Sequence, residues 1–166
     1  MKVKVGVLSA GGDCPGINST VHWLVYSALD KDLAPERGMM FEVLGIVDGW
    51  KGLMEVKPDN KESLKHWTLP LDKEMVRTWD RYGGTRLGTS RVNPFDPKKD
   101  RSAVVVENVE KLGLDALVVI GGFDNLGVAY KLYREGVRVV GIPKTIDRDI
   151  AGTDSVSYTH LTLPTN

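Results

Sequence analysis

The chain has 166 residues, of which 42% are hydrophobic, and this is enough for one globular domain with a sizeable core. Lysine plus arginine and aspartate plus glutamate are balanced at 22 each, so no overall field recruits nucleic acid or a membrane, and neither is expected as a partner. The single cysteine, Cys14, excludes an internal disulfide, and the sequence shows no signal peptide or long apolar span, so a cytoplasmic protein is expected.

The first unit is an apolar strand at 4–8, a glycine-rich turn at 9–16 and a helix at 17–29. Such a turn leaves backbone N–H groups at a helix N-terminus, where phosphate binds, and the missing β-carbons of Gly11 and Gly12 permit close approach. The turn contains neither GxGxxG nor GxxxxGK[ST]. Phosphate binding is therefore one interpretation, and a βα turn that binds nothing is the other.

The second strand is expected at 41–47, and Asp48, Gly49 and Trp50 end it. Residues 51–60 show no clear period and are expected to form a connection. The aromatic residues that follow in a polar segment are assigned to packing rather than to ligand stacking. They are Trp67, Trp79 and Tyr82.

A second glycine-rich segment spans 83–91 and carries small hydroxyl residues with Arg86 and Arg91. Backbone, hydroxyl and guanidinium donors could bind a phosphate there, and a plain surface loop is the alternative. The helix expected at 101–112 has an apolar face that should pack on the sheet.

The run at 114–120 is almost continuously apolar, which is typical of a parallel strand buried on both faces. Gly121 and Gly122 end it, a helix follows at 126–133, and another strand is expected at 137–142. Strands and helices alternate, so the sequence predicts an α/β fold: a three-layer, doubly wound, Rossmann-like sheet with right-handed crossovers and three glycine-rich turns at one edge.

The segment 141–149, Gly-Ile-Pro-Lys-Thr-Ile-Asp-Arg-Asp, is where we expect the chemistry. Pro143 must end the strand, so the polar residues emerge at its carboxyl end, where open α/β sheets bind ligands. Two carboxylates, Asp147 and Asp149, flanked by Lys144 and Arg148, suit proton abstraction beside a polyanion. A solvated turn is the alternative.

These segments, taken in order, resemble the phosphofructokinase family over about 5–154. The matching residues are Gly11-Gly12-Asp13, Pro15-Gly16, Asn18, Gly83-Gly84-Thr85, Gly88-Thr89-Ser90-Arg91, Gly121-Gly122 and Thr145-Ile146-Asp147. The resemblance implies that the fold is the family's N-terminal domain, truncated. It also implies roles for site residues: Asp147 is the base that takes a proton from the 1-hydroxyl of fructose 6-phosphate, and Thr145 and Asp149 help to position the sugar and the phosphoryl group. The phosphoryl-donor side is implied to consist of Gly11, Gly12, Arg91 and Gly122.

Two residues favour diphosphate over ATP as the phosphoryl donor. Asp124 and Lys144 stand where the ATP-using branch of the family carries glycine. The Asp124 carboxylate would repel the α-phosphate of a nucleotide, and Lys144 would stabilise the charge on a diphosphate leaving group. The alternative is an ATP-dependent 6-phosphofructokinase in which Asp124 and Lys144 arose by drift within its lineage.

Two departures from the family pattern bear on activity. Phe123 stands where the family carries an acidic ligand of Mg²⁺, the cofactor that the resemblance implies, and phenylalanine cannot coordinate the ion. Asp124 is then the remaining candidate for the metal. The other departure is Arg148, where the family pattern usually has asparagine.

The last eleven residues, 156–166, resemble the translation of a transposon-type sequencing adapter. Our hypothesis is that 1–155 is an incomplete phosphoryl-donor-binding domain and 156–166 a non-native tail. The family's second half would then be missing, and homo-oligomerisation would belong to the full-length parent. Two other interpretations stay open: a non-catalytic fragment that binds phosphate, and a lipid or nucleotide kinase with a similar glycine turn.

Overall fold

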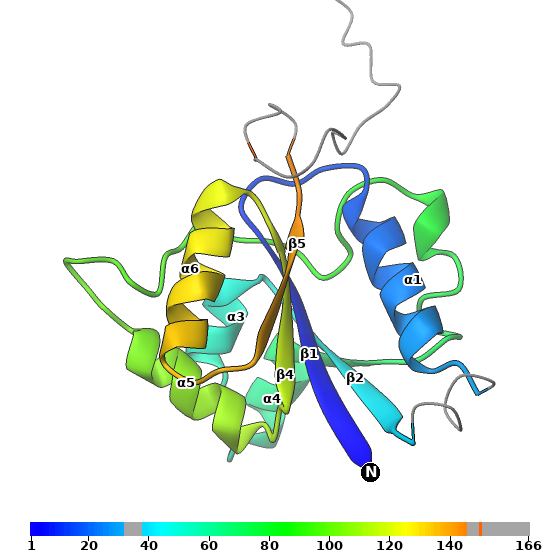
Figure 1. Cartoon of the computed structure of the whole chain (residues 1–166), viewed down its shortest axis with the longest axis horizontal. Coiled ribbons are helices and arrows are strands. Elements are labelled where there is room, and N and C mark those ends of the chain that lie inside the picture. The colour runs from blue at the N-terminus through cyan, green and yellow to red at the C-terminus, as the bar shows by residue number, and fades with distance from the viewer. Residues whose placement is uncertain (32–37, 146–149, 151–166) are drawn as a thin grey trace, which may run out of the picture.

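The computed structural model describes residues 1–31, 38–145 and 150 (Figure 1). Within these residues five strands form one sheet in the order β3-β2-β1-β4-β5. Four of them are parallel, and β3 pairs antiparallel with β2 at one edge. The strands are β1 (Lys2–Ala10), β2 (Met40–Ile46), β3 (Thr68–Leu71), β4 (Ala116–Gly121) and β5 (Val139–Pro143).

The strand order reverses between β1 and β4. The chain moves from β1 outward to β2 on one side, and it later returns to place β4 on the other side of β1. In the register of this pair Ala10 lies opposite Gly121, so both strands end at the same level and each is followed by a glycine. Open α/β sheets bind ligands at such a switch point, outside the carboxyl ends of the strands.

Helices cover both faces of the sheet (Figure 1). One face packs against α3 (Trp50–Glu55), α5 (Ser102–Lys111) and α6 (Phe123–Arg134), and the other packs against α1 (Ile17–Ala28). The strands alternate as a two-sided sheet requires, since Leu117 and Val119 face the first set of helices while Val118 and Ile120 face the second. These observations confirm the predicted α/β layers, and β4 is buried on both faces as expected.

The segment after β2 differs from expectation. Residues 51–60 were expected to form a connection, but α3 occupies 51–55, and α4 (Lys61–Trp67) and β3 follow later in the chain. The prediction failed because α3 has six residues and its glycine breaks the apolar pattern, so contacts with the rest of the fold define it. One helical turn, η1 (Trp79–Arg81), precedes the second glycine-rich segment.

The aromatic residues assigned to packing divide in two. Trp79 is buried and Trp67 packs at the edge of the core, as predicted. Tyr82 is 57% exposed, so its assignment to packing was wrong. Its ring lies instead under the Arg86 guanidinium, whose central carbon is 5.2 Å from the ring centre, because the face of an aromatic ring attracts a cation.

Among the described residues no helix is long and apolar enough to span a bilayer.

Candidate functional site

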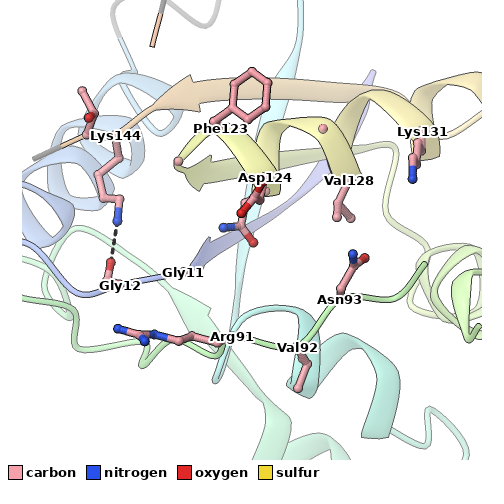
Figure 2. Close-up of a pocket in the computed structure, with 14 residues that line it drawn as sticks. Gly11, Gly12, Arg91, Val92, Asn93, Phe123, Asp124, Val128, Lys131 and Lys144 are labelled. Carbon is pink, nitrogen blue, oxygen red and sulfur yellow. Dashed lines mark hydrogen bonds between the residues drawn. The ribbon is translucent and has the colours of Figure 1, made fainter. Parts of the chain in front are cut away.

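A pocket of about 740 Å³ lies at the switch point of the sheet (Figure 2). Four segments contribute to it: the turn after β1, the end of the second glycine-rich segment, the start of α6 and the residues after β5. Its lining residues are Gly11, Gly12, Arg91, Val92, Asn93, Gly122, Phe123, Asp124, Asn125, Gly127, Val128, Lys131, Lys144 and Thr145.

The first two glycine-rich segments are joined by hydrogen bonds. The N–H of Gly11 donates to the carbonyl oxygen of Ser90 at 3.0 Å, and the Thr89 hydroxyl donates to the carbonyl oxygen of Gly11 at 2.8 Å. Gly11 has a φ of +91°, which a residue with a β-carbon rarely adopts. The predicted convergence of these turns is therefore a physical contact between backbones, and Arg91 lines the same pocket as Gly12 (Figure 2).

Buried polar side chains hold the second segment against the first unit. Asn18, only 2% exposed, donates from its amide to the carbonyl oxygens of Tyr82 and Gly83 and accepts from the Arg86 N–H at 2.7 Å. Ser9 donates to the Gly88 carbonyl oxygen at 2.8 Å. Because burial of these groups is offset only when their hydrogen bonds form, the segment 82–91 is fixed in place rather than being a free surface loop.

Lys144 links the third glycine-rich turn to the first. Its backbone N–H donates to the carbonyl oxygen of Gly121 at 3.0 Å, which continues the pairing of β5 with β4. Its Nζ donates to the carbonyl oxygen of Gly12 at 2.6 Å (Figure 2). An ammonium group therefore lies directly at the glycine pair that follows β1.

The α6 helix supplies one face of the pocket through residues at helical spacing. Asp124, Gly127, Val128 and Lys131 stand at i, i+3, i+4 and i+7 and all line the pocket. Asp124 is in the first turn of α6, where the helix dipole favours a negative group. A bound anion would gain from the same dipole.

The charge of the lining favours an anionic ligand. Its cations are Arg91, Lys131 and Lys144, and its only carboxylate among the described residues is that of Asp124. In a pocket whose walls have a lower dielectric than water, such an excess of positive charge attracts phosphate groups strongly.

Few side chains of the pocket could bind a metal ion. Phe123 is 71% exposed at the start of α6 and offers no oxygen, and no group of three or more His, Cys, Asp or Glu side chains able to hold a metal ion occurs in the described part of the chain. Mg²⁺ usually keeps several waters and takes one or two carboxylates with substrate phosphates. Among the described residues of the pocket, Asp124 supplies the only carboxylate, which is too few for a metal site built from protein ligands alone.

Seven of the predicted site residues line this one pocket. They are Gly11, Gly12, Arg91, Gly122, Asp124, Lys144 and Thr145. Asp147, Arg148 and Asp149 lie outside the described residues. The structure thus places the expected phosphoryl-donor residues together, and the roles assigned to all of these residues remain predictions.

Several pocket residues were not predicted. Lys131 and Val128 could have been found from the sequence, because both share the helical face of Asp124. Asn125 directly follows Asp124 in the first turn of α6, so its place near the predicted site was a local feature that was overlooked. Asn93 carries no such signal, since its place in the pocket depends on contacts between segments far apart in the chain. Trp50 does not line the pocket, but its indole N–H donates to Asn125 at 3.0 Å.

Comparison with known proteins gives one consistent result. Residues 4–157 match the family described as Phosphofructokinase. The chain is 45% identical over 153 residues to the pyrophosphate–fructose 6-phosphate 1-phosphotransferase of Dictyoglomus thermophilum, and 42% identical over 153 residues to the protein of the same name in Streptomyces coelicolor. These alignments cover 92% of this chain but only 39% and 40% of the two relatives, so the chain spans about two fifths of their length.

Solved structures show the same fold. Phosphofructokinase from Saccharomyces cerevisiae superposes with a TM-score of 0.66 at 27% identity, covering 93% of this chain and 21% of that one. Pichia pastoris phosphofructokinase in the T-state gives 0.72 at 26% identity, covering 94% and 16%. The pyrophosphate-dependent phosphofructokinase from Marinobacter aquaeolei gives 0.65 at 17% identity over 92% and 36%, a likeness of fold alone. Together with the glycine-rich turns and the pocket they form, these matches establish that the chain belongs to the phosphofructokinase family.

Proposed function

We propose that the pocket binds inorganic diphosphate as a phosphoryl donor. We further propose that the full-length protein transfers one phosphoryl group from it to the 1-hydroxyl of fructose 6-phosphate, a step of glycolysis. The observation that carries the proposal is the placement of Lys144 and Asp124 on one pocket with the glycine pair after β1. Two curated relatives named for this reaction are 42% and 45% identical to the chain.

Each group has a chemical task in this proposal. Lys144, held at the Gly12 carbonyl oxygen, would stabilise the negative charge that develops on the leaving phosphate. Arg91 would add bidentate hydrogen bonds to phosphate oxygens, and the glycines would let the ligand approach the backbone. Asp124 would disfavour a nucleotide by repelling its α-phosphate.

The acceptor side rests on the family resemblance. Thr145, 5% exposed, lines the edge of the pocket directly after Lys144. Asp147 would take the proton of the sugar 1-hydroxyl, and Asp149 would help to position the substrate; both follow Thr145 in the sequence. Mg²⁺ would supply charge neutralisation on the diphosphate oxygens, and Asp124 is the described carboxylate that would hold it.

Two alternatives have an observation in their favour. The pocket, at about 740 Å³, has the size of sites that hold drug-sized ligands, which favours ATP. The chain covers only 39% to 40% of its curated relatives, which favours phosphate binding without catalysis by the 166 residues alone. We also propose a cytoplasmic location, a homo-oligomeric full-length parent, and a domain boundary near residue 155.

The test has two parts. Calorimetric titration of the 166-residue chain with diphosphate and Mg²⁺, beside a titration with ATP, should show tighter binding of diphosphate. For activity, the gene should be resequenced beyond codon 155 and the full-length protein assayed with fructose 6-phosphate. Turnover with ATP that equals or exceeds turnover with diphosphate would contradict the proposed donor.

A further prediction concerns Asp147, the proposed general base. In the full-length protein, Asp147→Asn should lower kcat by about a hundredfold or more, the usual scale for a general base, with smaller changes in substrate affinity. The measurement is steady-state kinetics for both substrates, with Asp115→Asn, outside the pocket, as the control. A kcat within a few-fold of the parent's would remove Asp147 from the mechanism.

A further inference from the structure

Trp50 is a fully buried side chain that reaches the wall of the pocket from behind. It begins α3, and none of its surface is exposed. Its indole Nε1 donates a hydrogen bond to Oδ1 of Asn125 at 3.0 Å. Asn125 is in the first turn of α6, directly after Asp124, and lines the pocket.

The indole fixes which way the Asn125 amide points. An indole N–H can only donate, so the Asn125 atom that faces Trp50 must be the oxygen, and the NH₂ group must take the other side. That side is the turn after β1, because Nδ2 of Asn125 lies 2.8 Å from the position that a β-carbon on Gly11 would occupy. The amide therefore presents donors to the turn where the phosphoryl donor is proposed to bind.

The Asn125 side chain has little room to move. The β-carbon of Asn125 lies 2.7 Å from the position that a β-carbon on Gly121 would take, so a glycine at the end of β4 and one directly after β1 make room for the side chain. The start of α3 also touches the second glycine-rich segment, since the Lys51 N–H donates to the Ser90 hydroxyl at 3.2 Å. One short helix thus contacts two of the segments that form the pocket.

We propose that Trp50 is a positioning residue for the phosphoryl donor. By holding the oxygen of Asn125, it keeps the two amide N–H groups directed at the anion; this inference rests on the proposed binding of diphosphate in the pocket. With the amide reversed, a carbonyl oxygen would face the phosphate and repel it. Trp50 itself touches no ligand and acts through Asn125.

The test compares conservative variants of two buried tryptophans. Trp50→Phe removes the indole N–H and keeps an aromatic ring, and it should weaken binding of diphosphate with Mg²⁺ to the 166-residue chain by about tenfold, the scale of one hydrogen bond to a charged group. Trp79→Phe is the matched control, because Trp79 is also buried but packs on the opposite face of the sheet. It should bind diphosphate as the parent chain does.

Two further measurements separate positioning from general stability. In ¹⁵N-labelled chain the Asn125 NH₂ resonances should shift when diphosphate is added, and Trp50→Phe should reduce that shift. In the full-length enzyme Trp50→Phe should raise KM for diphosphate and leave KM for fructose 6-phosphate unchanged. Asn125→Ala keeps Trp50 and should weaken diphosphate binding to a similar extent, so the proposal stays testable if Trp50→Phe does not fold.

The outcomes are distinct. If the parent chain binds diphosphate and the Trp50 and Asn125 variants bind it as tightly as the Trp79 control, the positioning role is overturned and the proposed function stands. If the parent chain does not bind diphosphate, the proposed function of the pocket fails, and the positioning role fails with it. Weakened binding in both variants with a normal control supports the inference.

Discussion

Asp124 and Lys144 line the same pocket from different segments, and we propose that both contribute to the choice of donor. Lys144 lies against the backbone of Gly12, close to the sheet, whereas Asp124 begins the helical face that runs along the pocket to Lys131. A donor longer than diphosphate would have to pass this carboxylate. Selectivity for the shorter donor would then come from a repulsive element as well as from an attractive one.

The first prediction concerns both residues together. Replacing Asp124 and Lys144 by Gly in the full-length enzyme should shift the ratio of kcat/KM for ATP over diphosphate by at least about tenfold toward ATP, since the repulsion and the leaving-group charge are both removed. Steady-state assays with each donor measure it. Asp96→Gly with Lys98→Gly, outside the pocket, is the matched control, and an unchanged ratio would place donor choice elsewhere.

A second prediction concerns Phe123, which lines the pocket without an oxygen. Phe123→Asp should raise activity at low Mg²⁺ and lower the Mg²⁺ concentration needed for half-maximal rate, because it adds a carboxylate beside Asp124. Tyr130→Asp, exposed farther along α6, is the control for added charge. A metal titration identical to that of the parent would show that Asp124 and water already complete the site.

At the scale of elements, α3 contacts two of the segments that form the pocket, although the sequence did not predict this helix. Trp50 and Leu53 are fully buried, and the helix follows a turn in which Asp48 has a φ of +55°. A six-residue helix has little intrinsic stability, so its formation depends on packing against the sheet. Local patterns predict strands and long amphipathic helices, but they do not predict an element that tertiary contacts create.

The hydrogen bonds of the site also could not be predicted from the sequence, because they depend on tertiary contacts. The turn after β1 and the segment 83–91 were interpreted as possible phosphate sites from local features, and Gly122 and Lys144 were added through the family resemblance. The link from Asn18 to Arg86 spans 68 positions, and that from Trp50 to Asn125 spans 75. No local pattern specifies such partners, so residues that act through them were missed.

The third prediction tests the turn that begins α3. Gly49 has φ +59° and ψ −131°, and a β-carbon there would collide with the carbonyl oxygen of Ser9. Gly49→Ala should therefore lower the free energy of unfolding by more than the roughly 1–3 kcal/mol of a strained backbone alone. Gly113→Ala is the matched control, because Gly113 has φ +66° with no atom near the added carbon.

The Gly113 variant should lose only about 1–2 kcal/mol, the cost of a left-handed conformation. Paired urea unfolding of the two variants measures the difference. Diphosphate binding should also weaken in Gly49→Ala, since α3 carries Trp50 and Lys51. Equal losses of stability in the two variants would show that the turn can move away from Ser9 and is not a fixed support.

At the scale of the whole molecule, the two faces of the sheet carry separate core clusters. One core cluster joins α3, α5 and α6 to the sheet, and the start of α6 faces the pocket; the other joins α1 and the segment up to Leu87 to the opposite face. The turns that meet at the pocket come from both sides. The sequence predicted the layers, but the strand order that brings β1 beside β4 follows from long-range pairing that no local run of residues encodes.

The last prediction concerns the segment 156–166, which we hypothesise to be encoded by a sequencing adapter. Its apolar residues, Val156, Leu161 and Leu163, stand among threonine, serine and proline, so its burial would offset little of the entropy of ordering it. Deleting 156–166 should therefore change the melting temperature of the chain by less than about 1 °C. In a domain of this size even 1 kcal/mol corresponds to about 2–4 °C, so calorimetry resolves the difference.

Leu132→Ala provides the positive control for that melt. Leu132 is fully buried in α6, and its truncation should cost about 2–5 kcal/mol through the cavity that it leaves. A deletion that lowers the melting temperature by several degrees, or amides of 156–166 that are protected from exchange, would show that the segment packs on the fold. The adapter hypothesis would then be wrong, and the unit that folds together would extend past residue 155.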